Sequence, residues 1–325
     1  MINMKNFFLL IIGFLLAIIF IYFANKLTDW DLVLNTISNV SLNWLILSSF
    51  SILASAATRA YRWSIISRNK DKYLRDFLPA TLIGYLGNYL LPLRSGELIR
   101  IWIISRITTI KFSFSTLSSI VDRTTDLISL SSILFLSIFI FPSNEYLYSL
   151  RPYAIILFII LFFMIILFSF FRKSIKINAE KLTISKNSII LFTGKLIKTT
   201  NTIVEQATFN KPFTILILLV FISIFDLLSI LFIIISLGWS LPYSATFLFF
   251  VFISFGGMLP STPGFIGIYQ IAAILAFGIY SISPSDAVAF SIIMQGLTAF
   301  SYLASGIIAL LFISPRLLKL KKSSK

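Results

Sequence analysis

The chain has 325 residues, of which 58% are hydrophobic and 12% charged, and its mean hydropathy is +0.97. So few polar side chains cannot cover a soluble protein of this length, and the absence of cysteine and histidine excludes disulfides, thiol nucleophiles and the commonest metal ligands, so we expect no metal and no cofactor. The net charge is +15, and the basic residues gather in segments that we expect on the cytoplasmic side of a membrane. This distribution argues against a nucleic-acid partner.

The first half of the chain predicts three spans and a motif-bearing segment. Residues 7–24 are long enough to cross a hydrocarbon core, which takes about 20 residues, and we expect a retained helix rather than a cleaved signal peptide. A second span is predicted at 40–58, followed by a basic loop over 59–75. The first motif occupies 77–105, and a third span covers 127–141.

The second half repeats this order of elements. It contains a span at 153–171, a basic loop at 172–211, a span at 213–237, a second motif at 245–280, a last span at 287–313 and a basic tail at 314–325. The three segments that we expect inside the cell, 59–75, 172–211 and 314–325, hold 19 of the 27 lysines and arginines. By the positive-inside rule, both termini and both basic loops are predicted to be cytoplasmic.

With this topology, the first motif enters and leaves the membrane on the cytoplasmic side, and the second motif enters and leaves it on the external side. Each motif is then a helical hairpin, either re-entrant or a pair of short spans. The predicted fold is therefore an all-α, polytopic membrane protein with an inverted repeat of span, span, hairpin, span. It has six full spans plus two hairpins, about eight transmembrane elements, in a single integral membrane domain, 1–325, with repeats at about 7–141 and 153–313.

The two motifs share a pattern of helix breaks. Residues 84–100 read GYLGNYLLPLRSGELIR and residues 254–270 read SFGGMLPSTPGFIGIYQ, and in both a Leu-Pro pair precedes a glycine at the same offset. Ser95 is placed to cap the second helix of the first hairpin, and Thr262 to cap a helix that starts at Pro263. Helix N-termini inside a membrane favour an anion and imply a cavity. The predicted breaks lie at Pro92, Gly96, Pro260, Pro263 and Gly267.

Charged residues inside the apolar chain are the main site candidates. Arg94, Glu97 and Arg100 either snorkel and pair with one another at helical spacing or face a polar interior as functional groups. Asp122 and Asp126, with Arg123 beside the first, either occupy the first turn of a helix at the interface or bind Arg94 or Arg100. Asp226 is either a partner of one of these arginines, which we favour, or a proton-coupling acid. Weaker candidates are Asn88, Gln270, Tyr85 and Tyr269.

At these positions the sequence resembles the flippase-like family that includes the transmembrane region of lysylphosphatidylglycerol synthase. The resemblance is carried by Asn88, Leu91-Pro92, Arg94, Gly96-Glu97, Arg100, Asp122-Arg123, Asp126, Pro260, Pro263-Gly264 and Gly267. It implies a multi-pass protein of the inner or plasma membrane that moves anionic or phosphate-bearing lipids between leaflets. Phe265, Gln270 and Asp122 depart from the family pattern. The soluble aminoacyl-transferring domain is absent from this sequence, so synthase activity is not expected.

The leading hypothesis is a lipid flippase whose substrate headgroup lies between the hairpin tips. Arg94 and Arg100 would bind the anion, together with Asn88, Ser95, Thr262 and Gly264. Glu97 lies at the same site, and the orienting partners would be Asp122, Arg123, Asp126 and Asp226. The alternatives are an intramembrane enzyme or accessory subunit of lipid-glycan or phospholipid synthesis, which the lack of a nucleophile disfavours, and a membrane scaffold. Membrane lipids are the expected partners, with lipid-modifying enzymes as further ones, and no nucleotide-binding loop is present.

Overall fold

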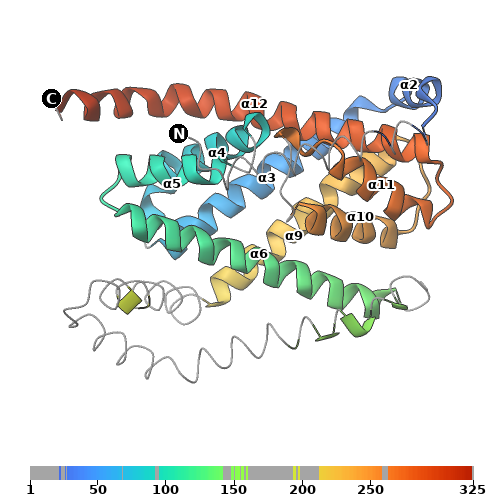
Figure 1. Ribbon diagram of the computed structural model, residues 1–325, viewed down its shortest axis with the longest axis horizontal. Helices are drawn as coiled ribbons and strands as arrows, with labels where there is room; N and C mark the ends of the chain where they lie inside the picture. Colours follow the sequence, from blue (N-terminus) through green and yellow to red (C-terminus); the bar gives the residue numbers. More distant parts are fainter. Residues whose placement is uncertain are drawn as a thin grey trace.

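Four long helices run lengthwise through the computed structural model (Figure 1). The structure describes residues 28–67, 69–91, 95–141, 212–257 and 263–323, together with single residues near 22–26 and 148–197. The long helices are α3 (Leu42–Ile66), α6 (Phe112–Ile140), α9 (Pro212–Ser236) and α12 (Pro284–Ser323). All of the described elements are helices, as predicted. Apart from single residues, the predicted spans 7–24 and 153–171 and the loop 172–211 lie outside the described residues.

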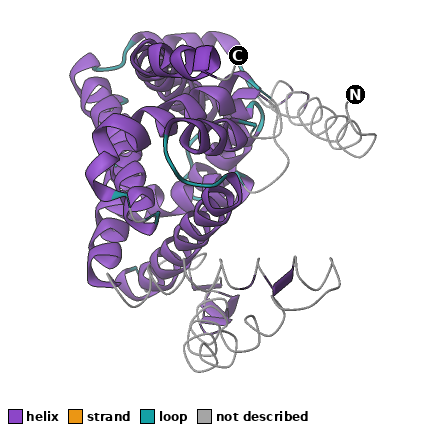
Figure 2. Ribbon diagram, turned by 90° about the vertical axis from the view of Figure 1, so that its left-hand side faces the viewer, coloured by secondary structure: helices purple, strands orange, loops and turns teal. Residues whose placement is uncertain are grey.

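The shorter helices form two hairpins at opposite ends of the molecule. One lies at the left of Figure 1 and the other at the right. The first consists of α4 (Leu78–Leu90) and α5 (Gly96–Ile107), and the second of α10 (Tyr243–Gly256), the short η5 (Pro263–Phe265) and α11 (Ile268–Gly278). The remaining elements are α2 (Trp30–Ser38), η1 (Lys70–Lys72) and η2 (Tyr73–Phe77). Seen along the long axis, the described helices pack side by side (Figure 2).

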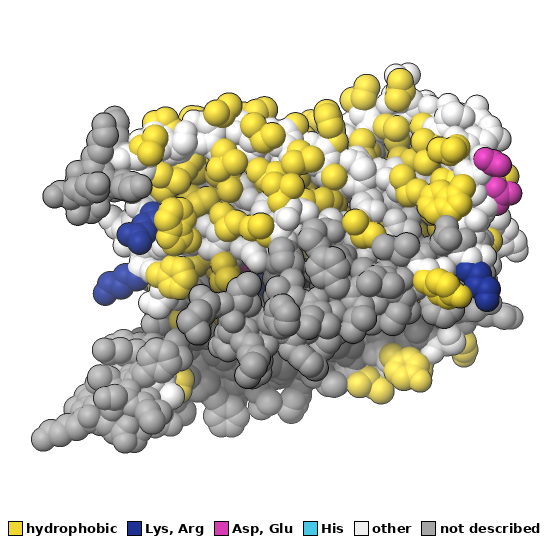
Figure 3. All heavy atoms as spheres, turned by 45° about the horizontal axis from the view of Figure 1, so that its top comes forward, with side chains coloured by type: hydrophobic (Ala, Val, Ile, Leu, Met, Phe, Trp, Pro, Cys, Tyr) yellow, Lys and Arg dark blue, Asp and Glu magenta, His cyan; other side chains and the backbone are white. Residues whose placement is uncertain are grey.

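The outer surface is apolar, as expected for a protein that lies in lipid. Large side chains such as Phe213, Leu311 and Phe50 are 72%, 70% and 67% exposed. Hydrophobic side chains cover much of the upper part of the face shown in Figure 3, and the charged side chains that stand out there lie near its left and right ends. Two described segments, Phe213–Ser236 and Pro284–Leu318, are long and apolar enough to cross a membrane, and α2 with α3, bent by 90°, is a third candidate.

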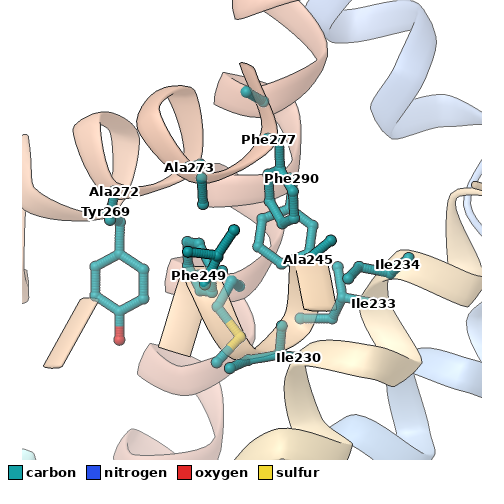
Figure 4. Packing of buried hydrophobic residues seen from close by; sticks show 14 of the residues in the cluster. Ile230, Ile233, Ile234, Ala245, Phe249, Tyr269, Ala272, Ala273, Phe277 and Phe290 are labelled. Atoms are coloured by element: carbon teal, nitrogen blue, oxygen red, sulfur yellow. The ribbon is translucent and has the colours of Figure 1, made fainter. Parts of the chain in front are cut away.

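Each hairpin has its own hydrophobic core against the long helices. In the second, Phe249, Phe277 and Phe290 pack with ring centroids 4.7 to 5.5 Å apart, joining α10, α11 and α12 (Figure 4). In the first, Trp63 of α3 packs edge-on against Phe77 at 5.1 Å, within a buried cluster that includes residues of α4, α5 and α12. These contacts fix the helices of both hairpins against the long helices.

Two predicted boundaries were wrong, and the predicted basic tail is helical as far as Ser323. The span expected to end at Thr58 continues as α3 to Ile66, so Arg59 and Arg62 lie within a helix rather than in a basic loop. The helix continues because carboxylates of neighbouring helices neutralise both arginines. Asp122 and Asp126 lie in the middle of α6, which begins at Phe112, rather than in a first turn. The tail at 314–323 continues α12, and Arg316 is anchored by a 2.6 Å contact with Asp76.

Candidate functional site

A network of charged side chains joins four helices in the interior. The described members are Arg59 and Arg62 of α3, Glu97 and Arg100 of α5, Asp122, Arg123 and Asp126 of α6, and Asp226 of α9. Among the described residues, four arginines face four carboxylates, so their charges balance. Balance matters here because an uncompensated charge in a membrane interior is costly.

One part of the network is built around two fully buried arginines, Arg62 and Arg100. The Nε of Arg62 donates to Asp122 Oδ1 at 2.8 Å, and its Nη2 donates to Asp126 Oδ1 at 2.7 Å. The Nε of Arg100 donates to Glu97 Oε2 at 2.8 Å, its Nη2 donates to the Ser119 hydroxyl at 2.8 Å, and the same Nη2 lies 3.6 Å from Asp122 Oδ2. Arg62 and Arg100 are 0% exposed. These interactions tie α3, α5 and α6 together.

The other part of the network faces a cavity. Arg59 Nη2 donates to Asp226 Oδ2 at 2.6 Å, and the Ser55 hydroxyl donates to Asp226 Oδ1 at 2.6 Å. Arg123 contacts Glu97 through its Nη2 and donates through Nη1 to Asp126 Oδ2 at 3.1 Å. The side chain of Arg123 is 36% exposed, the largest value among the described members of the network.

The cavity has a volume of about 280 Å³, near the lower end of the range for small-ligand sites. Arg59, Glu97, Arg123 and Asp226 supply its charged wall. A second wall is aromatic and is formed by Tyr85, Tyr89, Phe265, Tyr269 and Tyr302. Asn88 and residues of α9, α10 and α12, among them Ser229, Ser254 and Thr298, complete the lining. A polar cavity inside an apolar bundle suits a headgroup that must leave water.

The two hairpins touch beside this cavity. Tyr89, at the end of α4, brings its hydroxyl to 3.4 Å from that of Tyr269 in α11, and its ring centroid lies 6.0 Å from that of Phe265. The helices of the first hairpin approach closely because Gly84 and Gly87 of α4 face Gly96 of α5. The matched motifs are therefore neighbours in space.

In the second hairpin, the start of α11 differs from the one that the sequence predicted. Pro263 does not begin α11, because Gly264, Phe265 and Gly267 have positive φ (68°, 58° and 90°) and the α-helix starts only at Ile268. Gln270 Oε1 accepts the Gly267 N–H at 2.8 Å, and Gln270 Nε2 donates to Gln295 Oε1 at 3.0 Å. Gln295 in turn donates to the Gly264 carbonyl at 2.5 Å.

The second break is thus held by amides. Gln270, which departs from the family pattern, supports the backbone of the break and is not among the residues that line the cavity.

The structure brings together most of the predicted charged residues but changes two roles. Arg100 was expected to bind an anion, yet its buried guanidinium is held by Glu97 and Ser119 and packs 4.5 Å from the Trp63 ring, outside the cavity lining. Asp226 pairs with an arginine, as favoured, and among the described residues this partner is Arg59 and not Arg100, while Arg94 lies outside the described residues.

The other predicted site residues have different positions. Asn88 lines the cavity, whereas Ser95 and Gly264 do not. Ser95 precedes α5 but makes no side-chain capping bond to it, and Glu97 lies in the first turn of α5, as expected. The predicted residues Pro92, Arg94, Pro260 and Thr262 lie outside the described residues.

Arg59 and Arg62 were missed as site residues because a run of basic residues indicated a loop. A signal was present in the sequence, because Ser48, Ser51, Ser55, Arg59 and Arg62 follow one another at spacings of three or four. That spacing places them on one face of a helix. Because this spacing continues past Thr58, it predicts that the helix also continues and that its polar face points into the interior of the protein.

Comparison with known proteins identifies the family of the chain. The model of the family described as the lysylphosphatidylglycerol synthase TM region matches residues 10–306. No curated protein and no solved structure matches the chain.

Proposed function

Since this chain belongs to the family of the lysylphosphatidylglycerol synthase TM region, we propose that it moves an anionic or phosphate-bearing lipid between the leaflets of a cell membrane, inner or plasma. The observation that carries the proposal is the cavity with a wall of arginines and carboxylates inside an apolar bundle. Such groups are costly in a membrane and by default mark a substrate pathway.

The proposal includes an inverted repeat of span, span, hairpin, span, with six full spans, two hairpins and both termini in the cytoplasm. Support comes from the position of α4–α5 and α10–α11 at opposite ends of the molecule and from the contact of Tyr89 with Tyr269 and Phe265 (Figure 1). In transporters built this way, substrate binds near the midplane, where one repeat moves against the other.

The lipid headgroup would occupy the cavity while its acyl chains stay in the bilayer. Arg59 and Arg123 take the role of anion ligands in place of Arg100, because both line the cavity and Arg100 does not. Arg94 remains a proposed third ligand, since it lies three residues before Glu97 in the chain. The planar guanidinium fork suits the oxygens of a phosphate. The lipid would leave chemically unchanged.

Replacing Arg123 by glutamine is expected to slow translocation of a fluorescent phosphatidylglycerol in proteoliposomes by about tenfold or more, because a charge-assisted hydrogen bond contributes about 1.5–3 kcal/mol. Arg123→Lys, which keeps the charge and loses the fork, should give an intermediate rate. The matched control is Arg106→Gln, since Arg106 is an exposed residue of α5 outside the cavity lining.

Unchanged translocation in both Arg123→Gln and Arg94→Ala at normal expression would refute the proposed site. Mass spectrometry of the recovered lipid tests the alternative function. A covalently altered lipid would favour an enzyme over a transporter.

A further inference from the structure

Two ion pairs of the described network have both members in the cavity lining, Glu97–Arg123 and Arg59–Asp226, and Glu97–Arg123 is the more exposed of the two. Both side chains line the cavity, and they are 23% and 36% exposed, whereas Arg62 and Asp122 form a pair that is 0% and 1% exposed. In the structure, the arginine best placed to meet an incoming anion is therefore already bound to an anion of the protein.

Each member of this pair has a second partner that would remain if the pair opened. Arg123 Nη1 donates to Asp126 Oδ2 at 3.1 Å, and Glu97 Oε2 accepts from Arg100 Nε at 2.8 Å. An anion that took the place of Glu97 at Nη2 would therefore leave Arg123 oriented and would leave Glu97 paired. Opening this contact avoids the large cost of an unpaired charge in a dry interior.

We propose that Glu97 is a resident anion of the cavity, which the phosphate of the lipid substrate displaces from Arg123. The inference rests on the proposed function. In it, Glu97 does not orient Arg123 for the substrate but occupies the place on Arg123 that the substrate takes. Glu97 competes with the substrate for Arg123. Only a headgroup that binds Arg123 more strongly than the Glu97 carboxylate does can therefore displace it.

Selectivity follows from this competition. A phosphodiester carries a full negative charge and two free oxygens that match the guanidinium fork, so it can replace a carboxylate. A headgroup with hydroxyls alone offers no charge and leaves the Glu97–Arg123 contact intact. The cavity is thereby expected to accept a phospholipid and to reject a neutral lipid of the same chain length.

Displacement would also act on the first hairpin. Glu97 lies in the first turn of α5 and Arg123 lies in α6, so the pair links the hairpin to a long helix. When phosphate occupies Arg123, this link is lost, while Arg100 still donates to Ser119 of α6 at 2.8 Å. Substrate binding would weaken, without severing, the attachment of the hairpin.

The test is the affinity of the purified full-length protein for a short-chain phosphatidylglycerol, with the matching diacylglycerol as neutral probe. Glu97→Gln should bind phosphatidylglycerol at least about fivefold more tightly than the wild type, which is the smallest change in affinity that one bound group typically causes in the binding of another. Diacylglycerol binding should be unchanged. Asp71→Asn also removes one negative charge, from an exposed residue outside the cavity lining, and should leave both affinities as they are.

A double-variant comparison shows whether Glu97 acts through Arg123. The gain seen in Glu97→Gln should disappear when it is combined with Arg123→Gln. If Glu97→Gln fails to fold, Glu97→Asp serves instead, because it keeps a charge for Arg100 but is one methylene shorter, and a smaller gain is expected.

Equal or weaker binding of phosphatidylglycerol by the Glu97 variants, with clear binding by the wild type, overturns the inference and leaves the proposed function standing. The absence of binding by the wild type and by every variant would overturn the proposed function and the inference with it. A gain that persists in the Arg123→Gln background would contradict the assigned partner.

Discussion

Replacing Gly96 by alanine is expected to prevent the first hairpin from forming. A Cβ at this position would lie 1.8 Å from the carbonyl oxygen of Gly84 and 2.6 Å from the backbone nitrogen of Asn88. Both atoms belong to the backbone of α4, so no side-chain rotation relieves the clash, and the two helices must separate. Overpacking of a core costs about 1–3 kcal/mol and occasionally more, and we expect the upper end or beyond.

The measurement is the thermal unfolding midpoint in detergent, followed by size-exclusion chromatography. Gly296→Ala is the matched control, because a Cβ there meets nothing within 4 Å and the residue lies in helix α12. Alanine in an open helical position should be neutral or stabilising by about 0.4–1 kcal/mol. Equal midpoints for the two variants would show that the hairpin does not pack as described.

Replacing Asp122 by asparagine is expected to destabilise the protein by about 3–5 kcal/mol, the cost of breaking a buried ion pair. Asp122 is 1% exposed and lies between Arg62 at 2.8 Å and Arg100 at 3.6 Å. Its loss leaves four arginines facing three carboxylates among the described residues of the network. The same unfolding assay measures the effect, and Asp71→Asn, at an exposed position, should change the midpoint little.

A paired variant separates lost charge balance from lost shape. Arg62→Met combined with Asp122→Leu leaves three arginines and three carboxylates in the described network, so it should be more stable than Asp122→Asn alone. A midpoint lower than that of the single variant would show that the specific hydrogen bonds of Arg62 matter more than balance.

Composition and pattern were sufficient for the general class of fold. An all-helical membrane protein followed from the lack of polar residues, and the two interrupted motifs at 77–105 and 245–280 correspond to α4–α5 and α10–α11. The glycines and prolines carried this information because they act locally, on backbone conformation and helix spacing.

The pairing of charges was not accessible from the sequence. Arg59 and Asp226 are separated by 167 residues, and only the packing of α3 against α9 brings them to 2.6 Å. The sequence indicated Arg100 as an anion ligand and Arg123 as an orienting partner, whereas the packing buries Arg100 and places Arg123 in the cavity lining. The basic run after Thr58 was misleading because the positive-inside rule counts charges and does not detect carboxylates that neutralise them from other helices.

Thiol accessibility tests most directly the claim that the two hairpins meet around a wet, charged cavity, because the natural chain has no cysteine. Single cysteines at Asn88 and Ser254 place one probe from each hairpin in the cavity lining, and Phe50, which is 67% exposed, supplies a lipid-facing control. With a charged thiol reagent on both sides of the membrane, Asn88→Cys and Ser254→Cys should react, Phe50→Cys should not, and phosphatidylglycerol should protect the first two. Cavity cysteines as unreactive as the one at Phe50 would contradict the claim.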